Sequence, residues 1–302
     1  MNTELHSATG APAQPAAVAP LLEVTDLSIS YEARSMFRRE RKNVVEGVTF
    51  DILPGETLGL VGESGSGKST VGRAILRLLE PSAGSIRFAG TEITSFGSRT
   101  PLSYRRDVQA VFQDPSTSLN PRQPVSMAVT AALQRHGMGD RAERDRKVAE
   151  VFDHVGLTRA HLDRYPSELS GGQQQRVAIA RALALRPRLV VCDEALSALD
   201  LSTQNQIINL LVDLQVETDM TYLFIGHNLE IVRHISDRIA VMRLGRLVEF
   251  AEAAQVFDHP EHPYTRKLLG ATPAEHPAGR DERRAVRAGF AHAHEEGLVP
   301  EV

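Results

Sequence analysis

The sequence has very little cysteine and no long apolar run. Its single cysteine, Cys192, excludes an internal disulfide and any metal cluster built from cysteines. Because Cys192 lies inside the apolar run "LVVCDE", we expect an inert buried thiol. No apolar run approaches the roughly 20 residues that a membrane-spanning helix needs, and the N-terminus lacks the basic stretch and apolar core of a signal peptide. These absences favour a cytosolic protein.

An excess of one sign of charge is also missing. The 34 Lys and Arg residues nearly balance the 38 Asp and Glu residues, which leaves a formal net charge of −4 at pH 7. Such a balance offers no bulk electrostatic argument for nucleic acid as a partner, and we expect none. The length of 302 residues allows one large domain with subdomains and a tail.

Composition divides the chain into three parts. Residues 1–20 are rich in Ala, Pro and Thr without periodicity, which predicts a disordered leader. We expect the folded domain over residues 21–270. Residues 271–302 are charged and Ala-rich without an apolar stripe, which predicts a loose tail. His292 and His294 lie there, but two ligands on a flexible segment do not close a metal coordination sphere.

Apolar periodicity predicts strands that alternate with helices. The strand candidates are 22–29, with one break in its alternation, "TLGLV" at 57–61, "RLVVCDE", "TYLFIGH" and a hairpin that turns at Leu244 and Gly245. A helical stripe runs through Val71, Ala74, Ile75, Leu78 and Leu79, and another through Ile207, Leu210, Leu211 and Leu214. We predict a parallel sheet with crossover helices, a mostly helical insert over about 116–166 and a short helical extension at "EAAQVFDHPEHPYTRKLL".

The stretch "GESGSGKST", residues 62–70, fits the phosphate-loop pattern G-x-x-x-x-G-K-[ST] between a predicted strand and a predicted helix. Its glycines let backbone N–H groups approach phosphate oxygens, Lys68 reaches the β- and γ-phosphates, and Ser69 coordinates Mg²⁺. A nucleoside triphosphate is therefore the predicted ligand. The predicted nucleotide-binding residues are Gly62, Glu63, Ser64, Gly65, Ser66, Gly67, Lys68, Ser69 and Thr70.

Two carboxylates follow the predicted strand "RLVVC". Asp193 stands at the carboxyl end of that strand, where ligands bind in open α/β sheets, and is the candidate second protein ligand of Mg²⁺. Glu194, one residue beyond, is the candidate general base for an attacking water. An isolated "DE" pair would read as ordinary solvated carboxylates, so this interpretation depends on the phosphate loop.

A second anion site is predicted at "LSGGQQQR". A helix that begins on Ser170, Gly171 and Gly172 presents unpaired N–H groups and a positive dipole end, which attract a phosphate. The sequence by itself does not say whose phosphate this site holds.

These motifs and their order resemble the ATP-binding cassette (ABC) ATPases over almost all of residues 21–270. Three further features of that family occur here in the same order: "FQD" with Gln113, "SALD" with Asp200, and His227. It implies an α/β P-loop NTPase fold with an antiparallel β subdomain, a parallel-sheet core, an α-helical insert and a short C-terminal extension. It also implies ATP and Mg²⁺ as cofactors.

The resemblance assigns roles to further residues. Tyr31 is expected to stack on adenine, and His227 to contact the γ-phosphate beside the catalytic Glu194. Gln113 is expected to be a metal ligand with Ser69 and Asp193, to belong to the catalytic set and to link the site to the helical insert. The signature loop is expected to close over the nucleotide of another ATPase subunit, a copy of this chain or a paralogue. The residues assigned to that trans contact are Ser170, Gly171, Gly172, Gln173 and Asp200.

Longer stretches narrow the resemblance. "VFQDPSTSLNPR" and "HPYTRKLL" are similar to the ATPase subunits of peptide, dipeptide and nickel importers, in particular the second of their two ATPase paralogues. That family implies two permease subunits and, indirectly, an extracytoplasmic solute-binding protein, with the ATPase on the cytoplasmic face of the plasma membrane. Family members usually carry Pro, Ser and Asp where Ala195, Gly226 and Asn228 stand, so turnover is expected to be slow if these residues alter the surroundings of Glu194 and His227.

Other classes fit the sequence less well. A chromosome-maintenance ATPase would place a long coiled coil between phosphate loop and signature, where this chain has only residues 71–169 without sustained heptads. A nucleotide kinase or GTPase has no use for "LSGGQ". The alternatives that stay open are the ATPase of a different single-cassette ABC transporter, for nickel, another solute or export, and a non-transport ABC ATPase.

Overall fold

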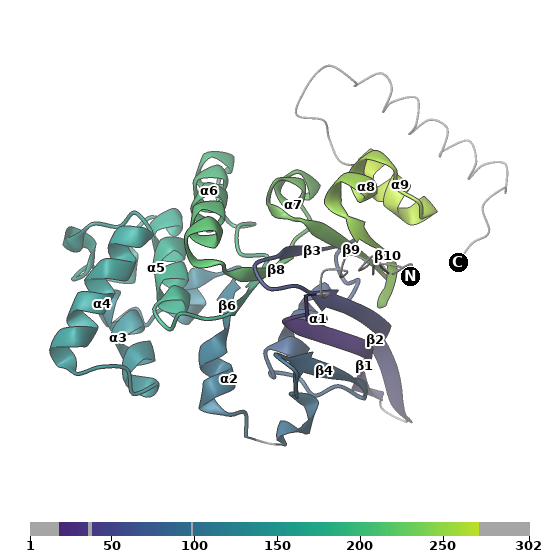
Figure 1. Ribbon diagram of the computed structural model, residues 1–302, viewed down its shortest axis with the longest axis horizontal. Coiled ribbons are helices and arrows are strands. Elements are labelled where there is room, and N and C mark those ends of the chain that lie inside the picture. Colours follow the sequence, from purple (N-terminus) through teal and green to yellow (C-terminus); the bar gives the residue numbers. More distant parts are fainter. Residues whose placement is uncertain (1–17, 36–37, 98, 272–302) are drawn as a thin grey trace, which may run out of the picture.

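The computed structural model describes residues 18–35, 38–97 and 99–271. Figure 1 shows two sheets side by side and a separate group of helices next to the larger sheet. Most of the predicted leader and tail, including His292 and His294, lies outside the described residues.

The smaller sheet is antiparallel, with strand order β2-β1-β4-β5. Its strands are β1 (Leu22–Ser35), β2 (Arg38–Ile52), β4 (Ala83–Phe88) and β5 (Thr91–Glu92). The predicted break in the alternation of β1 is a register shift between Val24 and Leu27, where Asp26 has φ +48°. This irregularity re-aims the strand, so Leu22, Val24, Leu27 and Ile29 are all buried.

The larger sheet has six strands in the order β10-β9-β3-β8-β7-β6. They are β3 (Thr57–Val61), β6 (Val108–Phe112), β7 (Leu189–Asp193), β8 (Thr221–Ile225), β9 (Arg238–Arg243) and β10 (Arg246–Glu252). All pairs are parallel except β9–β10, the hairpin predicted at Leu244 and Gly245. The predicted parallel sheet is therefore confirmed, and β3, β7 and β8 are buried along their whole length, as central parallel strands should be.

Helices connect and cover this sheet. They are α1 (Lys68–Ile75), α2 (Leu102–Asp107), α5 (Gly171–Leu183), α6 (Leu201–Thr218) and α7 (Leu229–Ile235). The apolar stripe predicted to run from Val71 to Leu79 extends past the helix. Helix α1 ends at Ile75, and Leu78 is 61% exposed. Arg77, at φ +57°, takes the left-handed conformation that ends the helical path before the stripe is complete.

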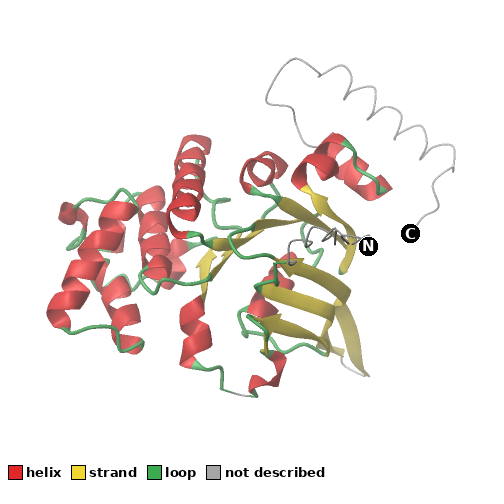
Figure 2. Cartoon of the chain, in the orientation of Figure 1, coloured by secondary structure: helices red, strands yellow, loops and turns green. Residues whose placement is uncertain are grey.

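A helical group stands beside the sheet and contains α3 (Ser126–Arg135), α4 (Arg141–His154) and the first part of α5 (Figure 2). Helix α4 begins at a capping box in which the Asp140 and Glu143 side chains each accept a hydrogen bond from the other residue's backbone N–H. The buried side chains of Val129, Leu133 and Phe152 join α3 and α4 to the main core.

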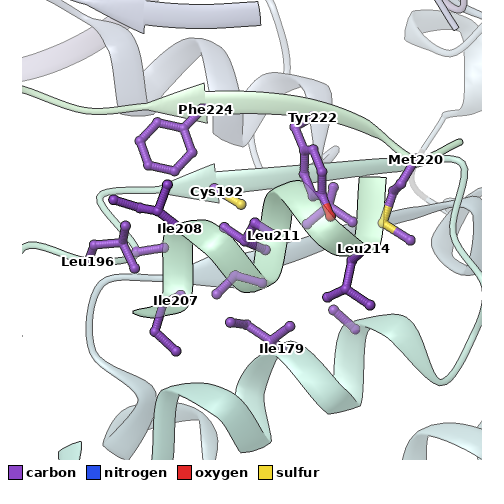
Figure 3. Packing of buried hydrophobic residues seen from close by; sticks show 14 of the residues in the cluster. Ile179, Cys192, Leu196, Ile207, Ile208, Leu211, Leu214, Met220, Tyr222 and Phe224 are labelled. Carbon is purple, nitrogen blue, oxygen red and sulfur yellow. The ribbon is translucent and has the colours of Figure 1, made fainter. Parts of the chain in front are cut away.

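The C-terminal extension consists of α8 (Ala253–Asp258) and α9 (Pro263–Ala271), next to the β9–β10 edge of the larger sheet. Figure 3 shows the core where α5 and α6 pack on β7 and β8. Cys192 lies inside this core, and burial raises the pKa of its thiol to about 12, which agrees with an inert buried thiol. In the described ranges, no helix combines the length and apolarity needed to cross a membrane.

Candidate nucleotide-binding site

The phosphate loop, residues 62–67, connects β3 to α1 and depends on glycine at two tight positions. Gly62 has φ +148° and Gly67 has φ +103°. A Cβ on Gly62 would lie 2.1 Å from the carbonyl oxygen of Met242, and one on Gly67 would lie 2.8 Å from that of Val44. Only a residue without a side chain fits both the backbone angle and the space at these positions. The loop is thus pressed against β2 and β9.

Hydrogen bonds hold the loop in place. The backbone N–H of Gly245, in the β9–β10 turn, donates to the carbonyl oxygen of Ser66 at 3.0 Å. The Nζ of Lys68 donates to the carbonyl oxygens of Gly62 and Glu63, both at 2.8 Å. Lys68 is only 4% exposed, and burial lowers the pKa of its ammonium group although Glu194, Asp193 and Glu63 oppose that shift. A lysine ammonium group carries three N–H donors. Its hydrogen bonds to the loop therefore hold a cation where phosphate oxygens would bind.

Two oxygen donors meet at the carboxyl ends of β3 and β7. The Ser69 hydroxyl donates to the Asp193 Oδ1 at 2.7 Å, although the two residues are 124 positions apart. Burial raises the pKa of Asp193, and the hydrogen bond from Ser69 opposes this shift. A hydroxyl and a carboxylate are ligands that Mg²⁺ prefers, so the pair predicted from the sequence forms a fitting set of donors.

Glu194 and His227 approach each other at the same edge. The His227 Nδ1 lies 3.9 Å from the Glu194 Oε1. Glu194 has φ +50°, and its backbone N–H donates to the carbonyl oxygen of Ile225 at 2.9 Å, which holds the strained turn after β7. Both residues line a small hollow with Ser197 and Gly226. A carboxylate and an imidazole facing one hollow are suited to accept a proton from water and to bind an anion.

Of the remaining predicted residues, Gln113 lies near the site and Tyr31 lies on the other sheet. Gln113 follows β6 directly, and because Phe112 is paired with Asp193, Gln113 lies at the same sheet edge one strand away. Tyr31 lies on β1 of the smaller sheet opposite Lys42 and is 40% exposed. The described contacts do not join Tyr31 to the phosphate loop, so its role as an adenine contact stays a prediction.

The signature loop is built separately from the phosphate loop. Ser170 caps α5, and its hydroxyl accepts a hydrogen bond from the Gln173 backbone N–H at 3.3 Å while the Gln173 Oε1 accepts one from the Ser170 N–H at 2.9 Å. The Gln173 amide also lies 3.3 Å from the His161 ring. Asp200 caps α6 by accepting from the Thr203 N–H and hydroxyl, and these bonds lower the pKa of its carboxyl group.

A Cβ on Gly172 would lie 2.4 Å from the Thr203 Cγ2, so a larger residue there would force Thr203 of the same chain to shift. Gly171 differs, because a Cβ there would meet only the Leu199 Cδ2, at an ordinary 3.5 Å. Ser170 and Gly171 are therefore free to face a molecule outside this chain.

Three positions differ from the pattern expected of the resemblance. Ala195 is 2% exposed, directly after Glu194. Asn228 caps α7 by accepting hydrogen bonds from the N–H groups of Glu230 and Ile231. A Cβ on Gly226 would meet Phe224 and Val232 at an ordinary 3.5 Å. With these residues beside them, Glu194 and His227 lie 3.9 Å apart.

Sequence reasoning missed the residues that clamp the phosphate loop from outside. Gly245 and Tyr264 both bond to it, from the β9–β10 turn and from α9. Neither belongs to a local motif that predicts such a contact, because each lies more than 170 residues from the loop.

Two family descriptions match the chain. The family described as "ABC transporter" matches residues 45–197, and the one described as "Oligopeptide/dipeptide transporter, C-terminal region" matches residues 248–296. Among curated proteins, the chain is similar to the "Glutathione import ATP-binding protein GsiA" of Salmonella paratyphi A (49% identical) and of Escherichia coli O157:H7 (48%), each over 270 residues. These matches cover 88% of this chain but only 43% of the relatives' length.

Two solved structures have the same arrangement. One is cbiO1 from Clostridium perfringens, part of the ABC transporter complex cbiONQ, with a TM-score of 0.70, 28% identity, and coverage of 80% of this chain and 91% of that one. The other is the ATP-binding cassette MJ0796, a dimer bound to ADP and Pi, with a TM-score of 0.68, 28% identity, and coverage of 77% and 98%. The predicted ABC-type fold is confirmed by these likenesses.

Proposed function

Because the chain belongs to the ABC transporter family, we propose that it is the ATP-hydrolysing subunit of an importer for peptide-like solutes. The meeting of Ser69, Asp193, Glu194 and His227 at one sheet edge, beside the phosphate loop, is the observation that carries the enzymatic part. The solute class is supported by the match of residues 248–296 to an oligopeptide/dipeptide transporter region and by the likeness to relatives named for import of glutathione, itself a peptide.

ATP is the proposed substrate. Its phosphates would lie against the N–H groups of residues 65–70 and the Lys68 ammonium, with the adenine against Tyr31. The Ser69 hydroxyl, the Asp193 carboxylate and the Gln113 amide would hold Mg²⁺, which when bound neutralises charge on the phosphate oxygens. The hydroxyl and carboxylate already stand in contact at 2.7 Å, so they need little rearrangement to serve one ion.

Hydrolysis is proposed to use the Glu194 carboxylate as general base. Glu194 accepts a proton from water as the water oxygen attacks the γ-phosphorus, and the bond from that phosphorus to the bridging oxygen of ADP breaks. His227 would hold a γ-phosphate oxygen. Its place 3.9 Å from Glu194 keeps both groups on one side of the hollow.

A second ATPase subunit is the proposed partner of the signature loop. The hydrogen bonds that the structure describes for Ser170, Gln173 and Gln174 go to their own helical group and not to the phosphate loop of this subunit. A helix end such as the N-terminus of α5 attracts the γ-phosphate of the partner's ATP and loses most of that attraction once the phosphate has left. Binding would close the dimer and hydrolysis would open it. The partner is a copy of this chain or a paralogue.

Two permease subunits are the further proposed partners, with an extracytoplasmic solute-binding protein acting through them and this chain on the cytoplasmic face of the membrane. A groove runs beside α3 and the segment after β6, and Met127, 38% exposed, contributes an apolar side chain to it. Its lining includes Leu119, Asn120, Gln123, Pro124 and Ala128. Because the groove adjoins the segment that begins at Gln113, a permease loop seated there would be able to sense the metal site.

The test is uptake in proteoliposomes that contain the chain, its ATPase partner and both permeases, with radiolabelled di- and tripeptides supplied through the binding protein. We expect ATP-dependent uptake, and Gln113→Ala is expected to lower uptake more than basal ATP hydrolysis. Equal loss of uptake and of ATP hydrolysis would contradict a coupling role for Gln113. If ATP hydrolysis drove uptake of nickel or another solute but of no peptide, the proposed solute class would be wrong.

A further inference from the structure

The C-terminal extension reaches the phosphate loop through one hydroxyl. The backbone N–H of Glu63 donates to the Tyr264 Oη at 3.1 Å, a contact between residues 201 positions apart. Glu63 is the first residue after Gly62, so this bond holds the peptide at which the chain leaves β3 and enters the phosphate loop.

The peptide unit between Gly62 and Glu63 is held from both sides. Its N–H, that of Glu63, is bound by Tyr264, and its carbonyl oxygen, that of Gly62, accepts a hydrogen bond from the Lys68 Nζ at 2.8 Å. A peptide unit is planar, so the orientation of the Glu63 N–H also sets the orientation of the Gly62 carbonyl. The hydroxyl of Tyr264 therefore restricts the part of the loop against which the Lys68 ammonium rests.

Tyr264 is itself held firmly. It is 5% exposed within the main core, and the Arg243 guanidinium lies over its ring at 5.1 Å from the centroid. The Glu249 carboxylate, on β10, accepts hydrogen bonds from the backbone N–H groups of Glu261 and His262 at 2.9 and 3.0 Å. These bonds fix the segment that leads into α9. These contacts place the Tyr264 hydroxyl against the Glu63 N–H.

We propose that Tyr264 is a positioning residue of the nucleotide site, through which the C-terminal extension sets the geometry of the phosphate loop and hence the affinity for ATP. The inference rests on the proposed function, because it concerns the same site. It adds that residues 253–271 are part of the machinery that binds nucleotide, and not only an appendage of the sheet.

The test is Tyr264→Phe, which removes the hydroxyl and keeps the ring under Arg243. A neutral hydrogen bond of this kind is worth about three- to tenfold in an equilibrium constant. We expect the dissociation constant for ATP, measured with a fluorescent ATP analogue and Mg²⁺, to rise by about that factor. KM for ATP should rise with it, while kcat should change less than twofold because Glu194 and His227 are untouched.

A matched control is available in Tyr222→Phe. Among the residues that the structure describes, the buried Tyr222 hydroxyl has no hydrogen-bond partner, and Figure 3 shows it among apolar side chains such as Leu214 and Met220. Losing it should leave the dissociation constant for ATP unchanged. This comparison separates the loss of the Glu63 contact from the general effect of removing a buried hydroxyl.

Amide hydrogen exchange of the nucleotide-free protein gives a readout that does not depend on turnover. A peptide spanning Glu63 should exchange faster in Tyr264→Phe than in the wild type or in Tyr222→Phe. Unchanged exchange together with an unchanged dissociation constant would overturn the inference. If the wild-type chain bound no ATP at all, the proposed function itself would fail, which is a distinguishable result.

Discussion

The phosphate loop and the signature loop are both suited to bind a phosphate, yet the chain treats them differently. The phosphate loop is enclosed by its own subunit, with the Val44 carbonyl, Met242, Gly245 and Tyr264 all in contact with it. The signature loop bonds to its own helical group and leaves Gly171 with room for a side chain. The phosphate loop is thus held within its own chain, whereas we propose that the signature loop is half of a site whose remaining part comes from another subunit.

The largest expected effect separates binding from chemistry within the enclosed site. Glu194→Gln should retain ATP binding but slow hydrolysis by roughly 10²–10⁴-fold, the usual contribution of a positioned general base. Lys68→Ala should instead weaken ATP binding, because it removes the buried ammonium from the phosphate loop. Phosphate release and nucleotide titration distinguish these two outcomes. Near-normal turnover in Glu194→Gln would mean that another group is the base.

The second prediction tests whether the signature loop completes a neighbour's site. Lys68→Ala and Gly171→Asp chains should each be nearly inactive as homodimers, because one lacks the phosphate-binding cation and the other presents a carboxylate to the partner's phosphate. In a mixed dimer one composite site is intact, and random pairing of equal amounts should restore about a quarter of all sites.

ATP hydrolysis after mixing is the measurement, with analytical ultracentrifugation to show that dimers form. If the natural partner is a paralogue, the two changes are divided between this chain and that partner, and each single change then leaves the opposite site assembled. Dimers of the mixed homologous chains that recover no activity would exclude the arrangement in trans.

The third prediction compares one glycine from each loop. Gly67→Ala should lower the free energy of unfolding by roughly 1–3 kcal/mol, because Gly67 has φ +103° and an added Cβ would meet the Val44 carbonyl. Gly171→Ala should leave it equal to the wild type or higher by up to about 1 kcal/mol, since alanine favours a helix and only Leu199 is near.

Urea unfolding without nucleotide measures both variants. ATP-dependent dimer formation should nevertheless weaken in Gly171→Ala, because the added methyl group would stand between α5 and the phosphate of the proposed partner subunit. A loss of monomer stability in Gly171→Ala as large as that in Gly67→Ala would erase the difference between the two loops.

The smallest expected effect concerns the cap of the signature helix. Ser170→Ala should lower the free energy of unfolding by about 1 kcal/mol, because the Gln173 N–H loses its side-chain acceptor. Ser170→Asn keeps a capping oxygen and is the matched control, expected to stay near the wild type. Chemical denaturation of both variants decides the point, and equal stability of Ser170→Ala and the wild type would mean that the cap contributes nothing to this helix.

Local patterns predicted much of the fold and of the chemistry. The buried strand at residues 57–61, the hairpin at Leu244 and the irregularity in β1 followed from periodicity and turn residues, because these features depend on near neighbours in the chain. The end of α1 did not follow, because the stripe continues to Leu79 while the backbone turns away after Ile75 at Arg77. A periodic pattern shows which residues can share a helix face, but it does not show where that face has nothing left to pack against.

The sequence by itself determined which chemical groups this protein has and the order in which they occur, including the phosphate loop, the Asp193–Glu194 pair and the signature. Tertiary structure decided which of them meet. Ser69 contacts Asp193 across 124 positions because β3 and β7 lie on either side of β8, with their carboxyl ends at one edge. Tyr264 contacts Glu63 across 201 positions because α9 follows the β9–β10 hairpin next to β3. Such contacts depend on strand order, which is set by the burial of apolar surface over the whole chain. Two motifs with known roles allowed the Ser69–Asp193 pair to be predicted, whereas no short stretch predicts the contact between Tyr264 and Glu63.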